Sequence, residues 1–315
     1  MLPLSSASPA LLCLSCCGLL WAQTGEQAQF RADTRLVVLH ASVVDRGGRL
    51  VTNLPQSAFK VYEDEVAQQL KLFRREDVPL SLGLVIDNSG SMRGKRQQVE
   101  ASALGMVKAS NPQDELFIVN FNDEAFLDTD LTSDFKKLEE GLTRLDSRGG
   151  TAMRDSISMS IDHLKAKAKR DKKVLVVITD GNDNTSVETL EKLIQKAQQS
   201  EVLIYAIGLL SEEEHREARR AKRALDALTT ASGGLAYYPK NVTDVEKLAL
   251  QVAHEIRNQY ILAYVPALQV LDGGFRRIRV TVEAPNKPAV RTRTGYYATP
   301  DRPKPAALPK TGPAS

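Results

Sequence analysis

Cysteine is scarce in this chain of 315 residues, which contains only Cys13, Cys16 and Cys17. All three lie in one apolar stretch near the start of the sequence. If that stretch is removed on export, the mature chain has no thiol. Disulfide bonds, thiolate metal sites and cysteine nucleophiles are then excluded from the rest of the protein.

An excess of charge of either sign is also absent. The 42 basic residues nearly balance the 39 acidic ones, which gives a net charge of +3. Such a balance argues against a dominant nucleic-acid-binding surface. Hydrophobic residues make up 42% of the chain, which is enough for a buried core, and the length favours two domains over one.

Apolar runs long enough to cross a membrane are missing as well. The segment from Leu11 to Trp21 is too short for a membrane helix and is typical of a signal-peptide core, so we predict a signal peptide at residues 1–22. No Lys or Arg precedes this segment. A lipid anchor on Cys16 or Cys17 is the alternative. We therefore expect an exported chain, periplasmic or secreted, with no integral membrane span once the signal is removed.

Signatures of several enzyme classes are absent too. No Gly-x-Gly-x-x-Gly follows an expected strand, no phosphate-binding loop is present, and there is no Gly-x-Ser-x-Gly elbow. The histidines lack the spacing of zinc ligands; they are His40, His163, His215 and His254. We therefore predict that the chain is not an enzyme.

The middle of the chain alternates apolar runs with segments of helical periodicity. Leu82–Ile86 and Val174–Ile178 are almost entirely apolar, which is typical of parallel strands buried on both faces. Strands that alternate with helices predict an α/β domain over residues 79–256, in which an open, mostly parallel sheet carries helices on both faces.

The regions on either side of this block are predicted to be β-rich. Residues 30–78 contain short apolar segments separated by turn signals, and Arg277–Val282, within residues 257–299, alternates apolar with other side chains. The two flanks form either separate units or one small β-sandwich-like domain in which they pair, and the sequence leaves both arrangements open. Residues 300–315 are rich in Pro, Lys and Ala and are predicted to be a disordered tail.

A basic segment, Lys165–Lys173, lies at the end of the helix expected near residues 153–167 and before the next expected strand. Cations at the carboxyl end of a helix complement the helix dipole. We expect these side chains to lie in solvent rather than to form a binding surface.

Oxygen-bearing side chains follow the first apolar strand of the α/β block. Asp87, Ser89 and Ser91 occupy alternate positions in the loop after Leu82–Ile86. In an open α/β sheet, ligands bind beyond the carboxyl ends of the strands. Carboxylate and hydroxyl oxygens are the donors that hard cations such as Mg²⁺ prefer. This loop alone also fits an ordinary turn whose Ser and Asp side chains cap a helix.

Two further loops belong to the same expected edge of the sheet. Thr151 follows Gly149 and Gly150 and precedes a helix, and Asp180 comes directly after the strand that contains Val174–Ile178. We expect both side chains to join the first three. The candidate metal ligands are therefore Asp87, Ser89, Ser91, Thr151 and Asp180.

In residue type, order and strand context, these five positions resemble the metal-ion-dependent adhesion site of von Willebrand factor A domains. The resemblance covers about residues 80–256 and implies the Rossmann-like fold of that family. The flanking segments resemble the exported bacterial proteins called VWFA-related Acidobacterial domain proteins; they are Ser57–Asp64, Tyr260–Pro266 and Arg293–Tyr297.

The resemblance also implies a function. One divalent cation, Mg²⁺ in the first place with Mn²⁺ or Ca²⁺ as alternatives, keeps an open coordination position that an Asp or Glu carboxylate of a protein partner fills. We therefore expect an exported module that binds a protein partner and no nucleic acid. The alternative is a scaffold or assembly subunit of the cell envelope whose metal is purely structural.

Overall fold

The computed structural model describes residues 36–300, apart from residue 76, residues 143–146, residue 182 and residues 211–214. The predicted signal peptide, and the predicted tail from residue 301 onward, lie outside the described residues. Within the described part of the chain, none of the helices is long and apolar enough to span a bilayer.

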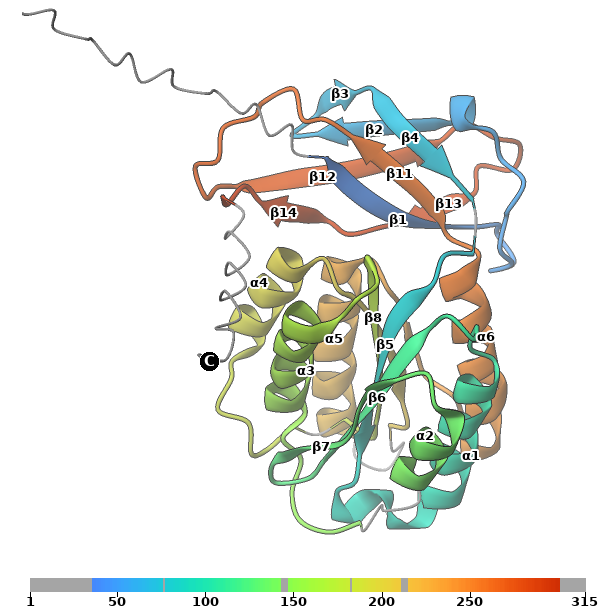
Figure 1. Cartoon of the computed structure of the whole chain (residues 1–315), viewed down its shortest axis with the longest axis vertical. Coiled ribbons are helices and arrows are strands. Elements are labelled where there is room, and N and C mark those ends of the chain that lie inside the picture. Colours follow the sequence, from blue (N-terminus) through green and yellow to red (C-terminus); the bar gives the residue numbers. More distant parts are fainter. Residues whose placement is uncertain (1–35, 76, 143–146, 182, 211–214, 301–315) are drawn as a thin grey trace, which may run out of the picture. The chain divides into compact units, whose positions relative to one another are not determined.

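A six-stranded sheet in the order β10-β9-β8-β5-β6-β7 forms the centre of the α/β block (Figure 1). All neighbouring strands are parallel except β7, which pairs antiparallel with β6. Every residue of β5, β6 and β9 is buried, which explains why their sequences are so apolar. The strands are β5 Leu80–Asp87, β6 Glu115–Phe121, β7 Ala125–Thr132, β8 Lys172–Thr179, β9 Leu203–Gly208 and β10 Ala236–Tyr237.

Helices cover both faces of this sheet (Figure 1). Helices α1, α2 and α6 enclose one hydrophobic core, which includes Met106, Val252 and Leu84 of β5. Helices α3, α4 and α5 enclose the second core, which includes Ile157 and Phe117. The predicted α/β fold is confirmed. The helices are α1 Arg96–Lys108, α2 Phe135–Leu142, α3 Met153–Lys167, α4 Leu190–Ser200, α5 His215–Ser232 and α6 Val245–Arg257, with 3-10 turns η1 Gln56–Ala58, η2 Gly90–Lys95 and η3 Val242–Asp244.

Strands from the two flanks of the α/β block pair with one another. They form two antiparallel sheets, β13-β1-β11-β4 and β14-β12-β2-β3, in which β1 pairs with β11 and β2 with β12. The two sheets share one core that includes Leu39, Val61, Tyr260 and Ile278. The strands are β1 Val37–Val44, β2 Phe59–Glu63, β3 Val66–Gln68, β4 Leu70–Arg74, β11 Tyr260–Tyr264, β12 Phe275–Val282, β13 Ala289–Arg291 and β14 Gly295–Tyr297.

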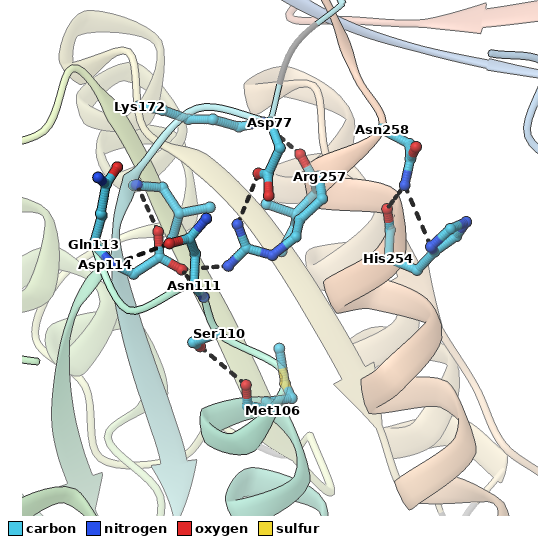
Figure 2. A network of polar contacts seen from close by, with 12 residues as sticks. Asp77, Met106, Ser110, Asn111, Gln113, Asp114, Lys172, His254, Arg257 and Asn258 are labelled. Carbon is cyan, nitrogen blue, oxygen red and sulfur yellow. Dashed lines mark hydrogen bonds and ion pairs between the residues drawn. The ribbon is translucent and has the colours of Figure 1, made fainter. Parts of the chain in front are cut away.

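Ion pairs join the two segments that connect these sheets to the α/β block. Arg257, at the end of α6, donates to Asp77 in the segment before β5 at 2.7 Å and also to Asp114 (Figure 2). The buried Asp114 carboxylate further accepts the backbone N–H groups of Leu80 at 3.0 Å and of Asn111 at 2.8 Å. The beginning of β5 and the end of α6 are therefore held together by side chains.

One residue of the basic segment contradicts the expectation of a solvated helix end. Lys172 is only 4% exposed and donates to the backbone carbonyl of Ile256. Strand β8 begins at this residue, so its side chain lies in the interior rather than at the end of α3. Burial lowers the pKa of the Lys172 ammonium to about 7.

Candidate metal centre

The strand pairing brings the loops of Asp87 and Asp180 to one edge of the parallel sheet, and the hydrogen bond from the N–H of Gly90 to the carbonyl of Gly149 at 3.2 Å places the Thr151 loop beside them. Asp87, the last residue of β5, is in register with Phe121 at the end of β6. The preceding residue of β5, Ile86, is in register with Ile178 near the end of β8. The loops that follow these strands therefore begin side by side at the carboxyl edge, where open α/β sheets bind their ligands.

Asp87 lies beneath this edge, with 2% of its surface exposed. Its Oδ1 accepts the backbone N–H of Ser89 at 2.9 Å, and its Oδ2 accepts the hydroxyl of Thr179 at 2.6 Å. The pKa of Asp87 is raised to about 6, chiefly by burial and to a smaller extent by the nearby charge of Asp180, although the hydrogen bonds from Ser89 and Thr179 lower it. The carboxylate is thus held rigidly in one orientation by its neighbours.

A chain of hydrogen bonds links the two serines to Asp180. The Oγ atoms of Ser89 and Ser91 lie 3.1 Å apart, and the Ser91 hydroxyl donates to Oδ1 of Asp180 at 3.0 Å. Gly181 follows with a φ of +98°, a conformation that favours glycine, and its N–H donates to Thr179 Oγ1 at 2.9 Å.

Thr151 is positioned by its backbone. Its N–H donates to Oδ1 of Asn184 at 2.9 Å, and its carbonyl accepts the N–H of Asn184 at 3.1 Å. Gly149 has a φ of +75°, and a Cβ there would lie 2.1 Å from a carboxylate oxygen of Asp123. Glycine is therefore required at this position both for the backbone conformation and for the close approach of Asp123.

Four of the five predicted ligands line one polar cavity of about 470 Å³: Ser89, Ser91, Thr151 and Asp180. Asp87, the fifth, lies behind the cavity and is connected to it through Ser89. Among the described residues there is no cluster of three or more His, Cys, Asp or Glu side chains with metal-binding geometry. The candidate site instead combines two carboxylates with three hydroxyls.

Lys95 was not anticipated from the sequence. This residue lies at the end of η2 and also lines the cavity. Its ammonium donates to Oδ2 of Asp180 at 2.9 Å and to the carbonyl of Leu209 at 3.3 Å. A cationic group thus lies directly against the carboxylate that was predicted to bind a metal.

Three supporting residues were also missed: Thr179, Asn184 and Asp123. Thr179 holds Asp87, Asn184 holds Thr151, and Asp123 accepts the N–H of Gly150 at 2.7 Å. Thr179 and Asn184 lie close to Asp180 in the sequence, and this proximity could have identified them as supporting residues. Asp123 precedes β7, a strand that was not predicted from the sequence.

The donor set fits a small, hard cation. Carboxylate and hydroxyl oxygens are typical ligands of Mg²⁺ and Mn²⁺, and such a site leaves room for water in the coordination sphere. The ammonium of Lys95 already marks Asp180 as a position that accepts positive charge. Ca²⁺ takes six to eight oxygens and Mg²⁺ six, so with one oxygen from each of these five side chains Ca²⁺ would need more water or backbone ligands than Mg²⁺.

Part of this sequence is similar to known proteins. An uncharacterised protein of Synechocystis is 28% identical over 136 residues, which cover 42% of this chain and 32% of that protein. Inter-alpha-trypsin inhibitor heavy chain H4 of Sus scrofa is 28% identical over 130 residues, covering 38% of this chain and 14% of that protein. The chain therefore spans about a third or less of the length of these curated relatives.

Among solved structures, the von Willebrand factor type A protein from Catenulispora acidiphila aligns with 84% of this chain and 75% of its own length, at 12% identity and a TM-score of 0.48. The family model described as von Willebrand factor type A domain matches residues 82–182, which include all the predicted ligand positions. This chain therefore contains a von Willebrand factor type A domain.

Proposed function

We propose that the chain binds a protein partner through a divalent cation held by Asp87, Ser89, Ser91, Thr151 and Asp180. A von Willebrand factor type A domain indicates protein–protein interaction or adhesion. The observation that carries the finer proposal is that four of these oxygen donors, from three loops, line one polar cavity and that Asp87 lies directly behind it.

Mg²⁺ is the ion we propose, with Mn²⁺ or Ca²⁺ as alternatives. Held at this site, the ion would supply an electrophilic centre whose remaining positions accept an Asp or Glu carboxylate of the partner. The protein's own residues would orient the ligands and keep the approach to the cavity open. Asp87 is fixed from behind by Thr179, and Gly149 and Gly150 line the cavity without side chains that would block an approaching partner.

We propose binding rather than catalysis at this site. The Asp87 carboxylate is occupied by Ser89 and Thr179, and the Asp180 carboxylate by Ser91 and Lys95. Both carboxylates are also among the five proposed metal ligands. Neither is therefore available as a general base for a hydrolytic reaction.

Direct metal binding tests the first part of the proposal. Titration calorimetry with Mg²⁺ and Mn²⁺ should show one site in the wild type and in Thr151→Ser, which keeps the hydroxyl, and weaker binding in Thr151→Val, which has the same shape without it. Asp180→Ala should abolish binding, and Ser110→Ala, which lies outside the site, should not change it. One-site binding that survives in Asp180→Ala would place the ion elsewhere.

Partner recognition tests the second part. The immobilised chain is exposed to extracellular and envelope proteins of its own organism with Mg²⁺ or with EDTA. A partner retained only with Mg²⁺, and lost in Asp180→Ala while the thermal midpoint of the metal-free protein is unchanged, supports metal-mediated recognition. Equal retention in both arms, together with a lower thermal midpoint in EDTA, would support the alternative of an envelope scaffold with a purely structural metal.

Export remains part of the proposal. It depends on the predicted signal peptide at residues 1–22, with a lipid anchor on Cys16 or Cys17 as the alternative. Mass spectrometry of the chain from its own host checks this: cleavage near Ala22 supports a soluble exported form, and a diacylglyceryl adduct on cysteine supports the anchor.

A further inference from the structure

A second cavity lies far from the metal centre, at the opposite edge of the parallel sheet. Its volume is about 690 Å³, within the range of sites for small organic ligands. One wall is the face of the β1-β11-β4 sheet that points away from the β-sandwich core. The other wall is formed by the segment that leads into β8 and by the beginning of β9.

The sheet wall is mostly apolar, with His40 of β1 and Arg74 of β4 as its polar residues. Along β1, Val37 and Leu39 point into the sandwich core, whereas Val38 lines the cavity. Leu72 of β4 and Ile261 of β11 line it as well. A sheet face that contacts only water normally carries polar side chains, so this face is built for apolar contact.

The opposite wall is cationic, and Arg74 of β4 adds a further cation from the sheet wall. Arg74, Lys169, Arg170, Lys173 and Arg293 line the cavity, against two acidic residues, Asp171 and Glu201. Arg293 pairs with Glu201 at 3.1 Å. Within the described part of the chain, Arg74, Lys169 and Arg170 form no ion pair, so the cavity has uncompensated positive charge.

Three buried nitrogen atoms on the cavity lining have no hydrogen-bond partner among the described residues: Nδ1 of His40, Nε of Arg170 and Nε of Arg293. A buried polar group without a partner is costly, and a native structure usually satisfies it with a ligand or water. The pKa of His40 is held well below its usual range by burial and by the positive charges of Lys172, Arg293 and Lys173.

We propose that this cavity binds an amphiphilic carboxylate of the fatty-acid type. Its hydrocarbon body would lie against Val38, Leu72 and Ile261. Its anionic head would lie at the cationic wall, beside the guanidinium groups of Arg170 and Arg293. The site is separate from the metal centre and does not depend on the proposed metal-binding function.

Calorimetry on the full chain tests the proposal with three probes. Decanoate carries both the apolar body and the anionic head, decyltrimethylammonium carries the same tail with the opposite charge, and acetate carries the head alone. We expect decanoate to bind at one site and the other two at least tenfold more weakly. EDTA should leave the affinity for decanoate unchanged, which separates this result from the metal proposal.

Variants then locate the site. Arg170→Gln should weaken decanoate binding about tenfold, as expected for the loss of a charge-assisted contact. Leu72→Trp, which fills the cavity, should abolish binding while the thermal midpoint stays near that of the wild type. Lys240→Gln removes an exposed cation outside the cavity and is the matched control.

Several outcomes would overturn the proposal. They are no heat of binding with decanoate, equal affinity for decyltrimethylammonium, or equal weakening by Lys240→Gln and Arg170→Gln. Binding that persists in a folded Leu72→Trp variant would also place the ligand elsewhere.

Discussion

Replacing Lys95 with Met should raise the affinity of the chain for divalent cations. The Lys95 ammonium lies 2.9 Å from Oδ2 of Asp180, with side-chain exposures of 23% and 9%. A cation that binds Asp180 must displace this ammonium or share the carboxylate with it. Lys95 therefore acts as an internal competitor of the metal.

The size of the effect follows from this contact. A hydrogen bond between charged groups contributes about 1.5–3 kcal/mol when shielded, and the partial exposure of Lys95 reduces this to about 1–2 kcal/mol. Removing the competitor should therefore increase the affinity for Mg²⁺ or Mn²⁺ about 5- to 30-fold. Lys95→Arg keeps the charge and should bind the ions nearly as the wild type does.

Calorimetric titration of both variants measures the effect, with Lys108→Met, an exposed lysine at the end of α1, as the control. A folded Lys95→Met variant with unchanged or weaker metal affinity would refute the reasoning, since it would show that the ammonium supports the site. Absence of metal binding in the wild type would contradict the proposed function instead, so the two failures are distinguishable.

Further predictions concern stability. Thr179→Val keeps the side-chain shape but removes the hydrogen bond to Asp87, and should lower the free energy of unfolding of the metal-free protein by about 1–3 kcal/mol in urea denaturation. Arg257→Met leaves the buried Asp114 carboxylate without its cation and should cost about 3 kcal/mol in the same assay, whereas Asp77→Asn, which removes only the exposed partner, should cost about 1 kcal/mol or less. The pKa of Lys172 is about 7 in the folded chain and 10.5 in its ordinary state, so the unfolded chain binds more protons between these values and stability should rise with pH there. Lys172→Met should reduce the rise of stability with pH and should stabilise the protein at pH 7 by about 2–4 kcal/mol. An unchanged dependence of stability on pH in a folded Lys172→Met variant would show that the ammonium does not titrate in this range.

The central sheet could be predicted because its strands are buried on both faces. Short, continuous apolar runs such as Val174–Ile178, placed between segments of helical periodicity, are typical of strands in a covered parallel sheet. Strand β7 was not predicted because it is not buried on both faces. It lies at the sheet edge, exposes Phe126 and Leu127, and includes Asp128 and Asp130, so neither an apolar run nor a regular alternation marks it.

The five proposed ligands were predictable because each follows or precedes a recognisable element at the same sheet edge. Lys95 was not, because its contact with Asp180 joins residues 85 positions apart and depends on the path of the η2 turn. Lys172 was assigned to the surface for a similar reason. Its charge favours solvent, and only the position of α6 above the beginning of β8 shows that its side chain is buried.

The two proposed binding sites lie at opposite ends of the same strand. Strand β8 begins at Lys172, which lines the second cavity, and ends at Thr179, which holds Asp87 of the candidate metal centre. At about 3.3 Å per residue, these ends are about 23 Å apart. The strand between them is almost entirely buried in two close-packed cores, which do not permit it to slide.

This arrangement predicts that the two sites act independently. Effects of substitutions more than about 10 Å apart, without shared partners, usually add. The double variant Lys95→Met/Arg170→Gln should therefore show the metal affinity of Lys95→Met and the decanoate affinity of Arg170→Gln, as measured by calorimetry with each ligand in the presence and absence of the other. A change of more than about threefold in either affinity would require a second arrangement of β8 or α6, because a rigid strand cannot transmit it.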